Sequence, residues 1–222
     1  MSKIIDLTRE ISNNMPVYPG DDEVKLYQTN FINKDGYNNH RLETGMHIGT
    51  HVDGPMHMTE SSIYISEIGL DKFIGRGILI DAKGEKIIDY KEEYEKVILE
   101  ESIVIINTGF SEEFGTEKYF NENPVVGKNF AELLVSKRVK ALCMDAPSPD
   151  RYPFEIHKLL LKNSIVIGEN LANLDKLVGF TDYEIFIVPL NIKADGSMAR
   201  IFARIEDKSA QTTSAYFDWL VE

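Results

Sequence analysis

Three of the five histidines in this chain lie within one stretch of 11 residues, where uniform placement would put about 0.25 histidine. They are His47, His51 and His57, and Asp53 lies between them. Neutral imidazole nitrogens and a carboxylate oxygen are ligands that suit a divalent cation of borderline hardness. The stretch therefore predicts a metal-binding site. A hydrogen-bonded histidine cluster that binds nothing is the alternative.

The backbone must bend within this stretch. In a straight strand all four side chains would share one face, but the first two histidines would lie about 13 Å apart. Two ligands of one ion, with bonds of about 2.1 Å each, cannot be that far apart. A continuous helix would pair those histidines and turn the aspartate away. Because Gly49, Gly54 and Pro55 permit a bend, we expect a strand that ends in a tight, curled loop.

The elements around this stretch indicate a mixed α/β fold. Apolar segments rich in β-branched residues predict strands at residues 4–7, 24–31, 77–81, 102–108, 139–144, 164–167, 183–190 and 198–205. Helical patterns fall at residues 90–99, 128–137 and 154–161. No repeat or linker interrupts the chain, so we expect a single domain over residues 1–222. The order of the strands does not follow from the pattern.

The composition narrows the class of partner and the compartment. The 222 residues carry a formal charge of −12, which argues against nucleic-acid and anionic-membrane partners because both require clustered cations. Cys143 is the only cysteine, so an internal disulfide and a thiolate zinc site are excluded. The N-terminal residues lack the pattern of a secretory signal, and no apolar run reaches the length of a membrane span. We therefore expect a cytoplasmic protein.

The segment His47-Ile-Gly-Thr-His51-Val-Asp53-Gly-Pro55-Met-His57 resembles the H-x-G-T-H-x-D-x-P-x-H signature of the cyclase superfamily. That family includes bacterial kynurenine formamidases (arylformamidases) and isatin hydrolases. Further resemblance covers nearly the whole chain, at residues 4–22, 144–150, 154–171 and 182–200. The resemblance implies an α/β fold with a single mixed-sheet domain of the cyclase/kynurenine formamidase type, similar to a swivelling β/β/α domain.

The same resemblance implies a metal-dependent amidohydrolase that acts on linear amides. N-formylkynurenine, cleaved to kynurenine and formate in tryptophan catabolism, is the first substrate. An isatin-type lactam or another aryl or cyclic amide is the second possibility, and a non-catalytic metal-binding protein is the third. No G-x-S-x-G pattern of a serine hydrolase is present.

By matching position, the resemblance assigns the metal ligands and the acid–base group. The ligands are His47, His51, Asp53, His157 and Glu169, and the catalytic acid/base is His57. One or two ions are possible, with Asp53 bridging two. Zn²⁺ is favoured from the formamidase branch, and Mn²⁺ is possible from the isatin branch.

Three aromatic features complete the expectations. Tyr18 and Phe31 are candidates for binding the aryl ring of the substrate, although both are as well explained as core residues. The aromatic segment at residues 214–221, which contains Trp219, is expected to pack on the body or at a subunit interface. The interface is favoured, which implies a homodimer or homotetramer.

Overall fold

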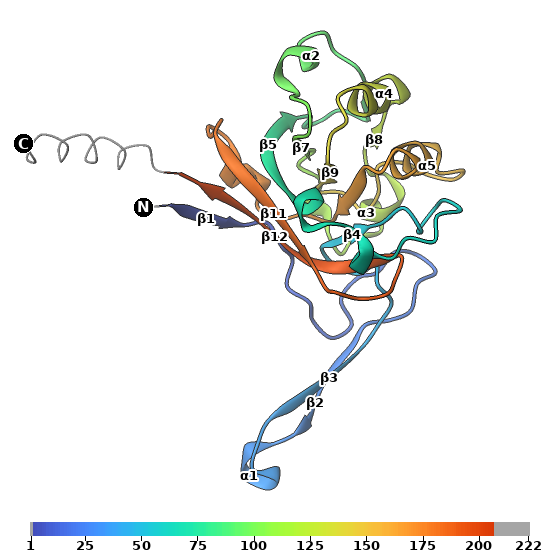
Figure 1. Ribbon diagram of the computed structural model, residues 1–222. Helices are drawn as coiled ribbons and strands as arrows, with labels where there is room; N and C mark the ends of the chain where they lie inside the picture. The colour runs from blue at the N-terminus through green and yellow to red at the C-terminus, as the bar shows by residue number, and fades with distance from the viewer. Residues whose placement is uncertain (1, 207–222) are drawn as a thin grey trace, which may run out of the picture.

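A mixed sheet of eight strands runs through residues 2–206, the part of the chain that this computed structural model describes (Figure 1). In spatial order the strands are β1 (Lys3–Asp6), β12 (Gly196–Ile205), β11 (Tyr183–Pro189), β5 (Ile74–Asp81), β7 (Ile103–Asn107), β9 (Ala141–Met144), β10 (Val166–Glu169) and β4 (His51–Asp53). The short strand β4 also pairs with β12. The strands from β12 around to β4 therefore close into a ring, with β1 beside β12 outside it.

Four neighbouring strands of the ring, β5, β7, β9 and β10, run parallel. Parallel strands need long crossover connections. Here α4 (Lys128–Ser136) lies between β7 and β9, and α5 (Glu155–Lys162) connects β9 to β10. Every residue of β7 and β9 is buried, as expected for parallel strands that are covered on both faces.

Two hydrophobic cores lie on opposite sides of these strands. Because side chains alternate along a strand, Val104 and Ile106 of β7 enter the core that contains Phe130 of α4. Ile103 and Ile105 enter the other core, which contains residues of β1, β4, β11 and β12. The helices α4 and α5 thus cover one side of the parallel strands and hold their ends in place.

Shorter elements connect the strands. They are η1 (Ile65–Glu67), η2 (Leu70–Phe73), β6 (Ile87–Ile88), α2 (Tyr94–Val97), η3 (Phe110–Glu113), α3 (Glu117–Asn121), β8 (Val125–Val126) and η4 (Leu174–Leu177). The strands β6 and β8 form a separate parallel pair. Among residues 2–206, no helix has both the length and the apolar character needed to cross a membrane.

The mixed α/β fold predicted from the sequence is confirmed, and each predicted strand has a counterpart at nearly the same residues. The helices predicted at 128–137 and 154–161 are present as α4 and α5. The helix predicted at 90–99 is too long, because only Tyr94–Val97 is helical: Glu92 and Glu93 form a turn, and Lys91 before them pairs with Glu85. The aromatic segment 214–221 lies outside the described residues.

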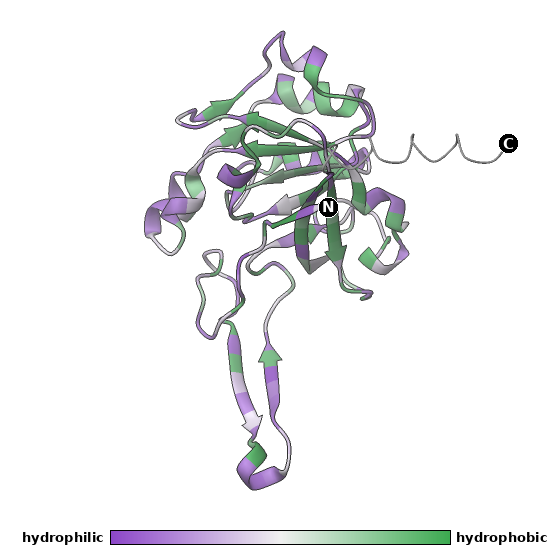
Figure 2. Cartoon of the chain, turned by 90° about the vertical axis from the view of Figure 1, so that its left-hand side faces the viewer, coloured by the Kyte–Doolittle hydropathy of each residue, from purple (hydrophilic) through white to green (hydrophobic). Residues whose placement is uncertain are grey.

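A hairpin that projects from the body is the one large feature that the sequence pattern did not predict. It is formed by β2 (Lys25–Asn30) and β3 (Asn39–Glu43), with the short helix α1 (Ile32–Asp35) at its tip (Figures 1 and 2). We call residues 25–43 the arm. The polar sequence of β3 lacks the alternation that marks a half-buried strand, so nothing in the pattern distinguished it from a loop.

Candidate functional site

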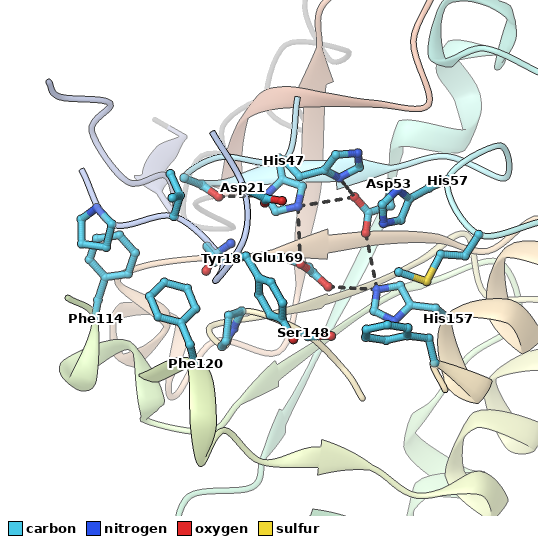
Figure 3. A pocket seen from close by; sticks show the side chains of 18 residues that line it. Tyr18, Asp21, His47, Asp53, His57, Phe114, Phe120, Ser148, His157 and Glu169 are labelled. Atoms are coloured by element: carbon cyan, nitrogen blue, oxygen red, sulfur yellow. Dashed lines mark hydrogen bonds and ion pairs between the residues drawn. The ribbon is translucent and has the colours of Figure 1, made fainter. Parts of the chain in front are cut away.

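A cavity of about 190 Å³ lies beside β4 and β10, and its two ends differ in chemistry (Figure 3). One end presents imidazoles and carboxylates, and the other presents aromatic rings. All six residues assigned from the sequence to metal binding or acid–base chemistry line this cavity, namely His47, His51, Asp53, His57, His157 and Glu169. Figure 3 shows Phe114 and Phe120 on the side opposite to His57 and His157.

The register of the sheet brings three of these side chains together. His51 of β4 is the direct partner of Glu169 in β10, and Asp53 lies two residues further along the same strand. Residues paired across antiparallel strands point to the same face, as do residues at i and i+2. His51, Asp53 and Glu169 therefore share one face, while Val52 points into the core on the other.

The chain bends on both sides of β4. Before the strand, Gly49 has a φ of 52°, a left-handed conformation that glycine adopts without strain. This bend lets His47 fold back over Asp53, with Nδ1 at 2.7 Å from Oδ1. After the strand, a turn in which the amide of His57 donates to the carbonyl of Gly54 brings His57 back toward the cavity. The predicted strand with a curled loop is thus present, with an additional bend before it.

The ring nitrogen of His51 that faces the carboxylates is available as a ligand. Its Nδ1 is hydrogen-bonded to the carbonyl of Gly49 at 2.9 Å, so Nδ1 carries the proton. Its Nε2 lies 3.4 Å from Oδ1 of Asp53 and 3.4 Å from Oε2 of Glu169. Two ligands of a tetrahedral ion with bonds of about 2.1 Å lie about 3.4 Å apart. Both distances therefore match those between ligands of one cation, and the three ligand atoms all lie within 4.8 Å of one another.

His157 approaches the same carboxylates from α5. Its Nε2 lies 3.2 Å from Oε1 of Glu169 and 3.7 Å from Oδ2 of Asp53. Its Nδ1 is 2.5 Å from Oδ1 of Asp150, so in the neutral ring Nδ1 carries the proton and Nε2 is free to bind a cation. The other oxygen of Asp150 accepts the backbone amides of Ile156 and His157, at 2.6 and 3.3 Å, and so caps the start of α5.

His47 and His57 form a second, less buried group beside Asp53. Their rings are tilted by 30° relative to each other, with centroids 4.0 Å apart. Oδ2 of Asp195 is hydrogen-bonded to both of them, at 2.9 Å from Nε2 of His47 and 3.0 Å from Nδ1 of His57. A Cβ atom on the next residue, Gly196, would lie 2.5 Å from the His47 ring, so only glycine permits this approach.

The electrostatics of the site favour positive charge. Burial lowers the pKa of His47, but hydrogen bonds and negative charge from Asp53 and Asp195 outweigh it and raise the pKa to about 9. The same balance raises the pKa of His51 and that of His157. Burial favours protonation of Asp53, yet hydrogen bonds from the surrounding histidines hold its pKa well below the usual value. Such a site meets the electrostatic requirement for holding a cation.

One buried atom points to a missing partner. Oε1 of Glu169 is buried and accepts no hydrogen bond among the described residues, although Nε2 of His157 is 3.2 Å away. A buried carboxylate oxygen without a donor is costly. A divalent cation between Glu169, Asp53 and the two buried imidazoles would satisfy it, so the residues present fit the expected metal. Each carboxylate faces His51 with one oxygen and His157 with the other, which suits either one or two ions.

The two aromatic candidates separate in the structure. Tyr18 lines the cavity together with Phe114, Phe120 and Phe154. Phe31 does not line it: this residue lies at the tip of the arm, where its side chain is 46% exposed. The prediction that Phe31 belongs to the pocket of its own chain is therefore wrong, because the hairpin carries residue 31 away from the body.

Asp150 and Asp195 are site residues that the sequence analysis did not single out. Asp195 lies within the resembling segment 182–200, but the spacing in sequence gives no sign that it meets His57. Asp150 lies in the segment that resembles the family's Asp-x-x-Ser-x-Asp, seven residues before His157. A buried histidine near a helix start, preceded by an aspartate, is the only signal that pointed to this pair.

Comparisons with known proteins agree with this geometry. Residues 5–151 match the model of the Cyclase family, which is described as "Putative cyclase". The chain is 32% identical over 204 residues to an uncharacterised protein of Methanocaldococcus jannaschii, covering 90% of this chain and 98% of that protein. It is 28% identical over 211 residues to a kynurenine formamidase of Bacillus cereus, covering 91% of this chain and 98% of the relative.

Solved structures give the same result. A protein described as a potential metal-dependent hydrolase with cyclase activity superimposes with a TM-score of 0.78 and 26% identity, over 93% of this chain and all of the other. Isatin hydrolase A from Labrenzia aggregata shares the fold, with a TM-score of 0.82 at 21% identity over 93% of this chain and 94% of the other. With its signature segment folded around one cavity and two thirds of its length matched by the family model, this chain belongs to the Cyclase family.

Proposed function

We propose that this chain is a metal-dependent hydrolase of a carbon–nitrogen amide bond, and that its substrate is N-formylkynurenine, cleaved to kynurenine and formate in tryptophan breakdown. One observation carries the proposal: the cavity joins a buried set of imidazoles and carboxylates to a wall of aromatic rings. An aryl amide needs both ends of such a cavity, one for the reaction at the amide and the other for binding the aryl ring. The similarity to a kynurenine formamidase supports a formyl group as the acyl part.

The buried residues would hold the cation, which we expect to be Zn²⁺, with Mn²⁺ as the second choice. His51, Asp53, His157 and Glu169 provide the donor atoms, and His47 lies within reach through its contact with Asp53. A bound divalent cation would polarise the amide carbonyl and lower the pKa of water from 15.7 to about 7. With two ions, Asp53 would bridge them.

His57 acts as the acid and base in this proposal. Its Nδ1 lies 3.0 Å from Oδ2 of Asp195, so the carboxylate holds the proton on Nδ1 and leaves Nε2 free to act as the base. Nε2 takes a proton from the water whose oxygen attacks the carbonyl carbon. The same proton passes to the nitrogen as the C–N bond breaks, so an acid and an amine are released.

The aromatic end of the cavity orients the substrate. Tyr18 and Phe120 meet edge to face with centroids 6.0 Å apart, and Phe114 lies beside them. A flat aryl ring gains both apolar contact and edge-to-face stacking from such a wall. Binding there places the amide toward His57 and the carboxylates rather than toward solvent.

An isatin-type lactam is the second candidate, and one observation favours it. Among the described residues, no lysine or arginine lines the cavity to pair with the carboxylate of an amino acid. An uncharged cyclic amide needs no such partner. A protein that binds metal without catalysis is a third outcome. The presence of His57 and Asp195 beside the carboxylates argues against it.

We propose that the protein works in the cytoplasm. It binds a small amide as its substrate and binds neither nucleic acid nor a membrane. The single cysteine, Cys143, is buried in the core and free, which fits a reducing compartment. The charge of −12 opposes binding to polyanions.

A substrate panel tests the proposal. The purified chain is analysed for bound metal and then assayed with N-formylkynurenine, isatin and formanilide, each with Zn²⁺, Mn²⁺ or a chelator. Hydrolysis of N-formylkynurenine that depends on the metal supports the first candidate, and preference for isatin supports the second. A metal-loaded protein that hydrolyses no amide would show that the chain is a binding protein. His57→Ala should retain metal and lose turnover, and unchanged turnover would remove His57 from the mechanism.

A further inference from the structure

The aromatic end of the cavity is a series of rings in contact. Phe114, Phe120 and Tyr18 line the cavity, and the fully buried Tyr119 meets Phe114 and Phe120 edge to face, with centroids 5.2 and 5.1 Å apart. Phe120 meets Tyr18 in the same way at 6.0 Å. We call these four residues the aromatic wall. Because each ring packs against the next, the position of Phe114 affects the shape of the whole wall.

The ring of Phe114 belongs to a loop. The short helix η3 ends at this residue, and Gly115 follows it in the left-handed conformation, with a φ of 91°. Loop residues have more freedom than residues of helices and strands, because fewer backbone hydrogen bonds hold them. The ring therefore depends on side-chain contacts for its orientation.

Arg9 supplies such a contact from a segment far away in the sequence. Its guanidinium carbon lies 3.9 Å from the centroid of the Phe114 ring and 5.8 Å from that of Tyr119. A guanidinium within about 6 Å of a ring centroid is attracted to the face of the ring. At 3.9 Å the group covers one face of Phe114, so it restricts the rotation of a ring that also lines the cavity.

Arg9 is itself fixed at both its side chain and its backbone. Nη2 donates to the carbonyl and to the hydroxyl oxygen of Ser111, at 3.1 and 2.9 Å. Ser111 lies in η3, so the same guanidinium holds the short helix and the ring that follows it. The backbone amide of Arg9 donates to Oγ1 of Thr50 at 2.9 Å. Arg9 therefore has little freedom to move away from Phe114.

Buried hydrogen bonds connect this contact to the metal-binding end of the cavity. The hydroxyl of Thr50, the residue before His51, donates to the carbonyl of Asn170 at 2.8 Å. Asn170 follows Glu169, and its Oδ1 accepts the hydroxyl of Tyr119 at 2.8 Å. Buried and satisfied networks of this kind are rigid. The aromatic wall is thus held at a fixed place relative to the imidazoles and carboxylates.

The start of the loop is anchored without Arg9. Oδ1 of Asp145 accepts the backbone amide of Thr108 at 2.8 Å and the hydroxyl of Thr108 at 2.6 Å. Both residues are buried, so water does not compete for these bonds. Removal of the guanidinium is therefore expected to release the ring of Phe114 without unfolding the loop.

We propose that Arg9 is a positioning residue for substrate binding, which holds the ring of Phe114 in the orientation that receives a flat aryl group. This inference rests on the proposed function, since it assigns the aryl part of the substrate to the aromatic wall. Arg9 is not among the residues that line the cavity. It acts through Phe114, so it sets the affinity for the aryl group and not the rate of the step at the metal-binding end.

Titration calorimetry with two ketones tests the proposal on the Zn²⁺-loaded protein. Acetophenone carries an aryl ring, and cyclohexyl methyl ketone has a similar size without one. Arg9→Met should raise the dissociation constant of acetophenone about three- to tenfold and that of the cyclohexyl ketone by less than about twofold. Arg9→Lys keeps the charge without the planar group and should lie between Arg9→Met and the wild type.

The control variant removes an arginine elsewhere. Arg138 is exposed, pairs with Glu100 at 2.6 Å and precedes β9, whereas the cavity residues follow that strand. Arg138→Met should leave both dissociation constants unchanged. An Arg9→Met variant that binds acetophenone like the wild type would overturn the proposal, as would a wild type that does not prefer the aryl ketone.

A double-mutant cycle shows whether Arg9 acts through Phe114. Phe114→Leu removes the ring, and in this background Arg9→Met should change the dissociation constant of acetophenone by less than about twofold. An equal effect of Arg9→Met in both backgrounds would mean that Arg9 acts elsewhere, which would refute the inference. Thermal melts confirm that each variant is folded, and Arg9→Lys takes the place of Arg9→Met in the cycle if the latter does not fold.

Kinetics separate this inference from the proposed function. On an aryl formamide that the chain hydrolyses, Arg9→Met should raise KM about three- to tenfold and leave kcat and bound metal within about twofold of the wild type. A fall in kcat at unchanged KM would contradict a role in binding. Neither ketone contains an amide, so the calorimetry decides the role of Arg9 even if the wild type hydrolyses no amide.

Discussion

The hydrogen bonds of Asp195 provide the sharpest test of the proposed chemistry. Its Oδ2 accepts from Nδ1 of His57 at 3.0 Å and from Nε2 of His47 at 2.9 Å. Asp195→Asn keeps the shape of the side chain and removes the negative charge. Hydrogen bonds to charged groups contribute about 1.5–3 kcal/mol and neutral ones about 0.5–1.5 kcal/mol. The change therefore costs about 1–3 kcal/mol over the two bonds.

A loss of that size in the transition state corresponds to about a 5- to 150-fold decrease in kcat/KM. Because the side chain of Asp195 is 37% exposed, solvent screening places the expected value near the lower end, at about tenfold. The decrease should appear in kcat, since Asp195 orients His57 and does not line the cavity. Steady-state kinetics on the fastest substrate of the panel gives kcat and kcat/KM, and bound metal is measured in parallel.

Asp175→Asn is the control for the loss of one negative charge. Asp175 is exposed on η4, and its substitution should change neither kcat nor KM. The reasoning is refuted if Asp195→Asn binds metal normally and keeps kcat/KM within about twofold of the wild type. A drop in metal content together with activity would instead place Asp195 among the groups that hold His47.

Three other perturbations follow from the site. Asp150→Ala removes the cap of α5 and the partner of His157. Unfolding by urea should show that the free energy of unfolding falls by about 0.5–2 kcal/mol, and titration calorimetry should show a metal affinity about 10- to 100-fold weaker. Unchanged metal affinity would contradict the role of Asp150. Zn²⁺ at 100 times its dissociation constant should stabilise the chain by about 2.7 kcal/mol, which a thermal melt detects and a chelator reverses. Glu169→Gln should abolish this effect, and a full shift in that variant would exclude Glu169 as a ligand. Gly196→Ala places a Cβ atom against His47 and should reduce turnover while leaving the far-ultraviolet circular dichroism unchanged; wild-type turnover would show that His47 can move without consequence.

The sequence allowed the strands and the centre of the site to be predicted for a physical reason. Buried parallel strands such as β7 are apolar at nearly every position, and that signal is local in the chain. The cluster around His51 and Asp53 is local as well, because β4 and its two flanking bends lie within a few residues. Both features are therefore visible in a short window of sequence.

The features that could not be predicted depend on distant parts of the chain. The meeting of Asp195 with His57 spans 138 residues, and only the pairing of β4 with β12 brings it about. The second strand of the arm, β3, could not be predicted, because it has no buried face and therefore no alternating pattern. The position of Phe31 has the same origin: its aromatic ring suits an aryl substrate, but the strand that it ends belongs to an outlying hairpin.

The closure of the ring by β4 has a consequence for how the protein matures. This three-residue strand bonds to β10 on one side and to β12 on the other, so the donor atoms of β4 gather with that of Glu169 only when two segments far apart in the sequence meet. Pairings at such separation form slowly. A nascent polypeptide still lacking β10 would offer only part of the donor set, and loading with metal is therefore expected to follow the synthesis of β10 rather than precede it.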